Sequence, residues 1–154
     1  MAPRTVIIGV GNAHRGDDGI GLIVARGLRG RIPEEIRIVE EPGDGAAILE
    51  ALAGAQRAIL VDAAQCAAPP GTIHRFDASD AKIPADFLRL SSHSFGAAAA
   101  IEMARALGEL PPRTIVYGIA GANFGNDEKL HPAVQQAAIA LIAQIGEELQ
   151  APGS

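Results

Sequence analysis

Four residues with metal-binding or proton-transferring side chains stand near the predicted ends of buried strands. Asp17 and Asp18 follow a strand at residues 5–8 and a glycine-rich turn, Asp62 ends another apolar strand, and His93 precedes an alanine-rich helix. Two carboxylates and one imidazole suit a borderline divalent ion such as nickel or zinc. No compact ligand motif such as H-E-x-x-H accompanies them. Spacing alone therefore supports an acidic cleft that is compatible with a metal, and no more.

Each of these residues also has a structural explanation. An aspartate before a helix commonly caps it by accepting backbone N–H bonds, which accounts for one of Asp17 and Asp18. A second carboxylate followed closely by glycines is harder to explain, because glycine weakens the start of a helix. Asp62 is costly to bury at the end of an apolar strand unless it is paired, and the alternative is that it caps the next segment. His93 on its own fits a turn residue bonded to the backbone.

The elements that position these residues alternate along the chain. Strands are expected at residues 5–8, 37–40, 58–61, 72–76 and 114–119, and helices at residues 20–28, 46–52, 94–107 and 132–149. This alternation predicts an α/β fold, a single three-layer αβα domain over residues 1–150 with a twisted, mostly parallel five-stranded sheet. Residues 151–154 are expected to be a loose tail. Ligands bind at the carboxyl ends of the strands in such sheets, so the polar residues should converge there.

Composition narrows the class of protein. The chain has 154 residues, of which 48% are hydrophobic and 20% charged, enough for one buried core. A net charge of -5 disfavours binding to nucleic acid, and no apolar run approaches the roughly 18 residues of a membrane span. A dinucleotide site is also disfavoured, because the third glycine of the first turn comes too late and the adjacent carboxylates repel a pyrophosphate. We expect a cytoplasmic monomer without nucleic-acid or membrane partners.

Four blocks of the sequence resemble the signatures of the hydrogenase maturation proteases. They are G-V-G-N at residues 9–12 with R-G-D-D-G-I-G at 15–21, V-D-A at 61–63 with P-G-T at 70–72, S-S-H at 91–93, and L-H-P-A-V at 130–134. The likeness runs in order from about residue 5 to residue 149. One departure is His131, where the family more often has serine. Another is the turn at residues 42–45, where the family often has a Gly-Gly-Thr-like sequence.

The resemblance implies an endopeptidase with a twisted sheet between helical layers, phosphorylase/hydrolase-like in fold. Such an enzyme removes a short C-terminal extension from the large-subunit precursor of a nickel–iron hydrogenase after nickel has been inserted. The resemblance further implies that Asp18, Asp62 and His93 bind the metal, that Asp17 supports the first of them, and that all four belong to the catalytic site. Nickel is then supplied by the precursor as a recognition signal, and other divalent ions such as zinc or cadmium could occupy the site in vitro.

Recognition of the partner is expected to involve the turn after the second strand, at Gly43, Asp44 and Gly45. In the resembling family this turn is associated with binding of the precursor. Because the sequence of the turn departs from the family pattern, the identity of the partner is left open to a greater degree than the activity.

Nothing in the sequence marks a nucleophilic side chain. Cys66 has no evident base, and the serines at 91, 92 and 94 are equivalent candidates. Water is therefore expected to attack the scissile bond, either activated by the metal or deprotonated by Asp17 or Asp18. A non-catalytic alternative is a nickel-sensing or chaperone-like module that binds the same precursor, because binding and cleavage would use the same cleft.

Overall fold

A mostly parallel sheet is the centre of the computed structural model, which describes residues 4–12, 14–42, 44–64, 67–82, 97–125 and 129–150. Its five strands lie in the order β2-β1-β3-β5-β4. They are β1 (Thr5–Val10), β2 (Arg37–Glu41), β3 (Arg57–Ala64), β4 (Ile73–Asp77) and β5 (Arg113–Ala120). All neighbours pair in parallel except β4, which runs antiparallel to β5 at one edge. The predicted type of sheet is confirmed.

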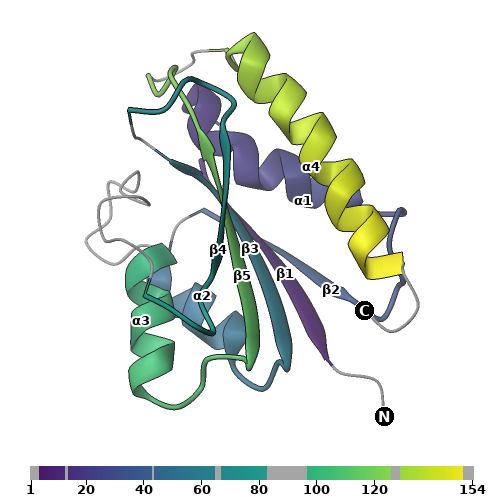
Figure 1. Ribbon diagram of the computed structural model, residues 1–154, viewed down its shortest axis with the longest axis vertical. Helices are drawn as coiled ribbons and strands as arrows, with labels where there is room; N and C mark the ends of the chain where they lie inside the picture. The colour runs from purple at the N-terminus through teal and green to yellow at the C-terminus, as the bar shows by residue number, and fades with distance from the viewer. Residues whose placement is uncertain are drawn as a thin grey trace.

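Helices cover both faces of this sheet (Figure 1). On one face lie α1 (Ile20–Leu28) and α4 (Pro132–Gln150), and on the other α2 (Gly45–Leu52) and α3 (Ala97–Ala106). A short 3₁₀ turn, η1 (Gly16–Gly19), leads into α1. The predicted three-layer α/β fold is therefore confirmed, while the predicted helix start at residues 94–96 and the tail at 151–154 lie outside the described residues. Within the described ranges, no helix is both long enough and apolar enough to cross a membrane.

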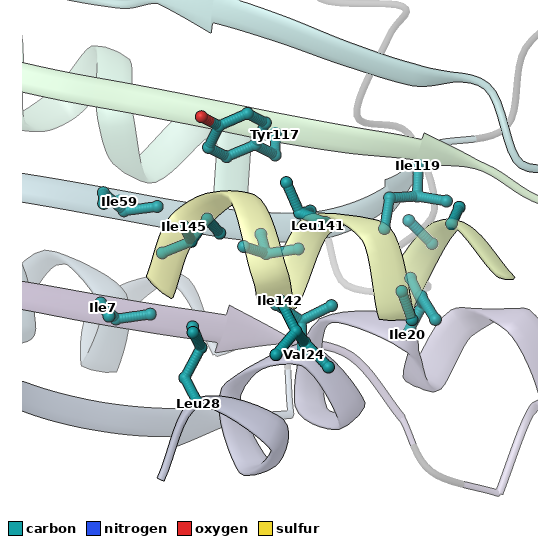
Figure 2. Packing of buried hydrophobic residues seen from close by; sticks show 14 of the residues in the cluster. Ile7, Ile20, Val24, Leu28, Ile59, Tyr117, Ile119, Leu141, Ile142 and Ile145 are labelled. Atoms are coloured by element: carbon teal, nitrogen blue, oxygen red, sulfur yellow. The ribbon is translucent and has the colours of Figure 1, made fainter. Parts of the chain in front are cut away.

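The two faces of the strands bury two separate apolar clusters. Ile7 and Ile59 face α1 and α4, whereas Ile8 and Leu60 face α2 and α3. Figure 2 shows the first cluster, in which side chains of α1 and α4 meet those of β1, β3 and β5. Because successive side chains alternate between faces, a strand covered on both sides needs apolar residues at every position. This requirement explains the continuous apolar runs that revealed β1 and β3 in the sequence.

Glycines allow α1 to pack very close to the sheet. A Cβ atom on Gly21, in the first turn of α1, would overlap the backbone oxygens of Val10 and Val61. A Cβ atom on Gly9 would lie only 2.7 Å from the Cβ of Ala25. The start of α1 is thus pressed against the carboxyl ends of β1 and β3, and η1 is held at the same edge.

The strand that carries Asp62 is longer than predicted. The sequence pattern ends it at residue 61, but β3 continues to Ala64, because residues 62–64 remain paired with residues 118–120 of β5. Asp62 therefore lies inside a central strand, where its own Oδ1 accepts the N–H of Ala63. The alternative that Asp62 caps the following segment is wrong.

Candidate active site

Asp18 and Asp62 come together at the carboxyl edge of the sheet. Asp18 lies in η1, shortly after β1, and Asp62 lies near the end of the neighbouring strand β3. Both are almost fully buried, with 7% and 4% of their surfaces exposed. Burial raises the pKa of Asp62 well above its ordinary value, and the negative charge of Asp18 raises it further. The two carboxyl groups therefore form an electrostatically coupled pair.

The backbone of the next residue, Ala63, supports the charged form of Asp62. The N–H of Ala63 donates to Oδ1 at 2.8 Å, which lowers the pKa but offsets only part of the effect of burial. Burial, and after it the charge of Asp18, therefore favour the protonated form of Asp62 in the free protein. An acid and a base side by side are what proton transfer to and from a substrate requires.

Replacing Asp62 by asparagine is expected to stabilise the free protein at neutral pH. Because the pKa of Asp62 is higher in the folded state than in the unfolded state, the wild type loses stability as the pH rises from about 4 through the folded-state pKa. Asparagine keeps the oxygen that accepts from Ala63 and carries no charge. The Tm of the variant minus that of the wild type should be near zero at about pH 4 and grow above it. A difference that shrinks with rising pH would contradict the raised pKa.

Asp17 has a different environment from its neighbour, although it is also buried, with 0% exposed. Its Oδ2 accepts the backbone N–H groups of Ala122 at 2.7 Å and Asn123 at 2.8 Å, and its Oδ1 accepts that of His131 at 2.9 Å. The N–H of Asp17 donates in turn to the carbonyl oxygen of Asn123 at 2.7 Å. All these partners belong to the connection between β5 and α4. The carboxylate therefore binds groups that lie 105 to 114 residues further along the chain.

Neither aspartate caps the helix that follows it. The N-cap residue of α1 is Gly19, and no side chain accepts a bond at that position. The capping alternative for Asp17 and Asp18 is therefore wrong. The physical reason is that both aspartates lie inside η1, before the N-cap of α1, where the side chain of Asp17 meets the β5–α4 connection.

The turn after β2 brings further acidic residues to this edge. Asp44 caps α2, its Oδ1 accepting a backbone N–H of the helix at 3.0 Å, and Gly45 begins the helix, while Gly43 lies outside the described residues. Glu41 ends β2, and its pKa is raised by burial and then by the charge of Asp44. The N–H of Gly11 donates to the backbone oxygen of Glu41 at 3.0 Å, joining this turn to the one that leads to η1. Sequence reasoning missed Glu41, which the rule for strand ends could have found.

The third predicted metal ligand, His93, lies outside the described residues, as do Cys66 and the serines at 91, 92 and 94. In the part of the chain that is described, no three His, Cys, Asp or Glu side chains gather in a way that could hold a metal ion. Asp18 and Asp62 are thus the two described members of the predicted donor set, and two carboxylates are suitable oxygen ligands for a divalent ion.

His131 takes the place of the serine that is more common in the resembling family. Its Nδ1 accepts the N–H of Ala133 at 3.1 Å, and its carbonyl oxygen accepts the N–H groups of Val134 and Gln135. This is the bonding pattern of an N-cap, in which a side chain satisfies a free N–H of the first turn. The departure in sequence therefore preserves the cap of α4.

Known proteins with similar sequences act in hydrogenase maturation. The sequence profile of the hydrogenase maturation protease family matches residues 24–148. The hydrogenase expression/formation protein HupD of Thiocapsa roseopersicina is 24% identical over 158 residues, covering 94% of this chain and 70% of HupD. The hydrogenase 2 maturation protease of Escherichia coli (strain K12) is 27% identical over 136 residues, covering 86% of this chain and 82% of that protein.

Solved structures of similar proteins share the fold. The hydrogenase maturating endopeptidase HybD from Escherichia coli superposes with a TM-score of 0.79 at 23% identity, over 97% of this chain and 94% of HybD. The [NiFe] hydrogenase maturation protease HycI from Thermococcus kodakarensis KOD1 gives 0.74 at 21% identity, over 97% and 94%. Fold and site define an α/β protein with a buried acidic edge at the ends of its parallel strands. The chain belongs to the hydrogenase maturation protease family, as its sequence blocks predicted, and is a peptidase.

Proposed function

We propose that this peptidase removes the C-terminal extension of a nickel–iron hydrogenase large-subunit precursor after nickel insertion, with nickel as the recognition signal. The observation that carries the proposal is the buried pair of Asp18 and Asp62 at the carboxyl edge of the sheet. Their oxygens, with the imidazole of His93 as the third donor, suit a nickel ion presented by the precursor. The ion is part of the substrate, so a nickel-free precursor brings no metal ion for these side chains to bind.

In this proposal water is the nucleophile, and a carboxyl group of the acidic pair accepts and passes on its proton. Asp18 accepts a proton as water attacks the scissile carbonyl, helped by the nickel ion of the substrate. Asp62, whose pKa is raised by burial and by the charge of Asp18, gives up its proton when it binds nickel. The proton that Asp18 takes from water then passes to the leaving amine as the C–N bond breaks. Asp17 is the weaker candidate for the base, because both of its oxygens accept backbone N–H groups.

The turn at Gly43, Asp44 and Gly45 is proposed to contact the precursor. Its supporting observation is its position, since the bond between Gly11 and Glu41 places the end of β2 beside the turn that leads to Asp18. A segment of the precursor that enters the acidic edge would pass this turn. We also propose that the protein works in the cytoplasm, where the precursor is made, and as a monomer.

The test is intact-mass spectrometry of an unprocessed large subunit from the same organism. Nickel-loaded and nickel-free precursor are each incubated with a catalytic amount of this protein. Loss of one C-terminal peptide from the nickel-loaded precursor alone supports the proposal. Equal cleavage without nickel would refute nickel as the signal. Stoichiometric binding with an unchanged precursor mass would favour the chaperone-like alternative.

A further inference from the structure

We propose that Asp17 is a positioning residue, which fastens the β5–α4 connection to η1 and so holds Asp18 beside Asp62. The inference rests on the proposed function, because that function assigns the chemistry to Asp18 and Asp62. It gives a physical basis to the expectation, implied by the resemblance, that Asp17 supports Asp18, and it departs from the expectation that Asp17 could itself be the base.

The bonds of Asp17 reach both ends of the β5–α4 connection. Ala122 and Asn123 follow directly after β5, and His131 directly precedes α4. One oxygen of the carboxylate takes the two donors at the first end, and the other oxygen takes the donor at the second end. A buried carboxylate that accepts three N–H bonds makes strong, charge-assisted contacts. If either end of the connection moves away from η1, one oxygen of the buried carboxylate loses its backbone donors.

Further contacts tie the same two segments together. A Cβ atom on Gly121 would lie 2.9 Å from the Cβ of Asp17, so the backbone after β5 touches η1 directly. The Nε of Arg15, the residue before η1, donates to the carbonyl oxygen of Phe124 at 3.3 Å. Asp18 follows in the same short turn, and its N–H donates to the carbonyl oxygen of Arg15 at 3.1 Å. The position of Asp18 in η1 thus depends on the contacts that its neighbours Arg15 and Asp17 make with the β5–α4 connection.

The same geometry argues against Asp17 as a base. A base needs an oxygen that can approach the proton it removes. Both oxygens of Asp17 face backbone donors, and none of its surface is exposed. Asp17 acts on the chemistry through Asp18, not through the substrate.

Two substitutions remove these hydrogen bonds, one at the acceptor, Asp17, and one at a donor, the N–H of residue 122. Asp17→Asn leaves one oxygen and turns an NH₂ group toward a backbone donor. Ala122→Pro keeps the side chain of Asp17 but deletes one N–H and puts the ring Cδ where that hydrogen points at Oδ2, so it pushes the carboxylate away from this end. The side chain at position 122 is exposed. Ala122→Ser is the matched control that keeps the N–H. Asp77→Asn is the second control, because Asp77 also accepts one backbone N–H, from Ser79 at 3.0 Å, at an exposed position.

We expect the kcat for cleavage of nickel-loaded precursor to fall about 100-fold in Asp17→Asn and about 10-fold in Ala122→Pro. The KM should change less than about threefold in both, since the contacts with the precursor are not removed. Both controls should have the kcat of the wild type. In Asp17→Asn the amide that faces the new NH₂ group, either that of Asn123 or that of His131, should exchange hydrogen about tenfold faster, as expected for a lost hydrogen bond.

Several outcomes would overturn the inference. If Ala122→Pro keeps the wild-type kcat while Asp17→Asn loses it, Asp17 takes part in the chemistry directly. If Asp17→Asn lowers only the Tm, its role is in stability alone. Should Asp17→Asn fail to fold, the comparison of Ala122→Pro with Ala122→Ser decides the question. Failure of the proposed function is distinguishable, because the wild type then cleaves no precursor while the amide exchange still reports whether Asp17 fastens the connection.

Discussion

Asp62→Asn is expected to cleave nickel-loaded precursor about 1,000-fold more slowly than the wild type while remaining folded. Asparagine has nearly the same volume and keeps an oxygen to accept the N–H of Ala63, so β3 and its surroundings are preserved. It cannot ionise and is therefore a weaker ligand for nickel than the carboxylate. The loss should therefore appear in turnover and not in the fold.

Initial rates from intact-mass spectrometry at several precursor concentrations measure this effect. Asp77→Asn serves as the matched control, because it makes the same chemical change on an exposed carboxyl group of β4. A rate for Asp62→Asn within a few-fold of the control would remove Asp62 from the chemistry. Together with the gain in Tm predicted for the same variant, a loss of rate would show that the buried charge is kept for activity at the expense of stability.

A second large effect is expected for Gly21→Ala, which should destabilise the fold by about 3 kcal/mol. The added Cβ would overlap the backbone oxygens of Val10 and Val61, and backbone atoms of two central strands cannot rotate out of the way. Relief would require α1 to lift from the sheet, which would also displace η1 and Asp18. Turnover should then fall along with stability.

Gly146 provides the control for this prediction. It lies within α4, and a Cβ there would meet nothing within 4 Å. Gly146→Ala should therefore stabilise the protein by about 0.5–1 kcal/mol, the ordinary gain from replacing glycine inside a helix. Denaturant unfolding of both variants measures the difference. Equal effects at the two positions would mean that α1 can retreat from the sheet without cost.

The fold could be predicted because its signals are local. Buried parallel strands need apolar residues at every position, and the helices that cover them need one apolar face. Both patterns can therefore be recognised in short stretches of sequence. The end of β3 could not be predicted in this way, since residues 62–64 stay in the strand only through pairing with β5. Glu41 was missed for a related reason, because the predicted strand ended one residue too early.

The role of Asp17 shows where local rules fail in the site. A carboxylate just before a helix predicts a cap, yet the groups that Asp17 binds lie 105 to 114 residues further along the chain. Nothing near Asp17 in the sequence indicates them. By contrast, the approach of Asp18 to Asp62 follows from the order of the parallel strands, because β1 and β3 are neighbours and their carboxyl ends meet at one edge.

The attachment of both ends of the β5–α4 connection to one carboxylate has a consequence for the order of folding. A single side chain near the N-terminus secures residues 122 and 123 at one end and residue 131 at the other. Because these partners lie 105 to 114 residues away in sequence, Asp17 can gain them only after β5 and α4 have reached the sheet. The acidic site is therefore expected to be completed late in folding.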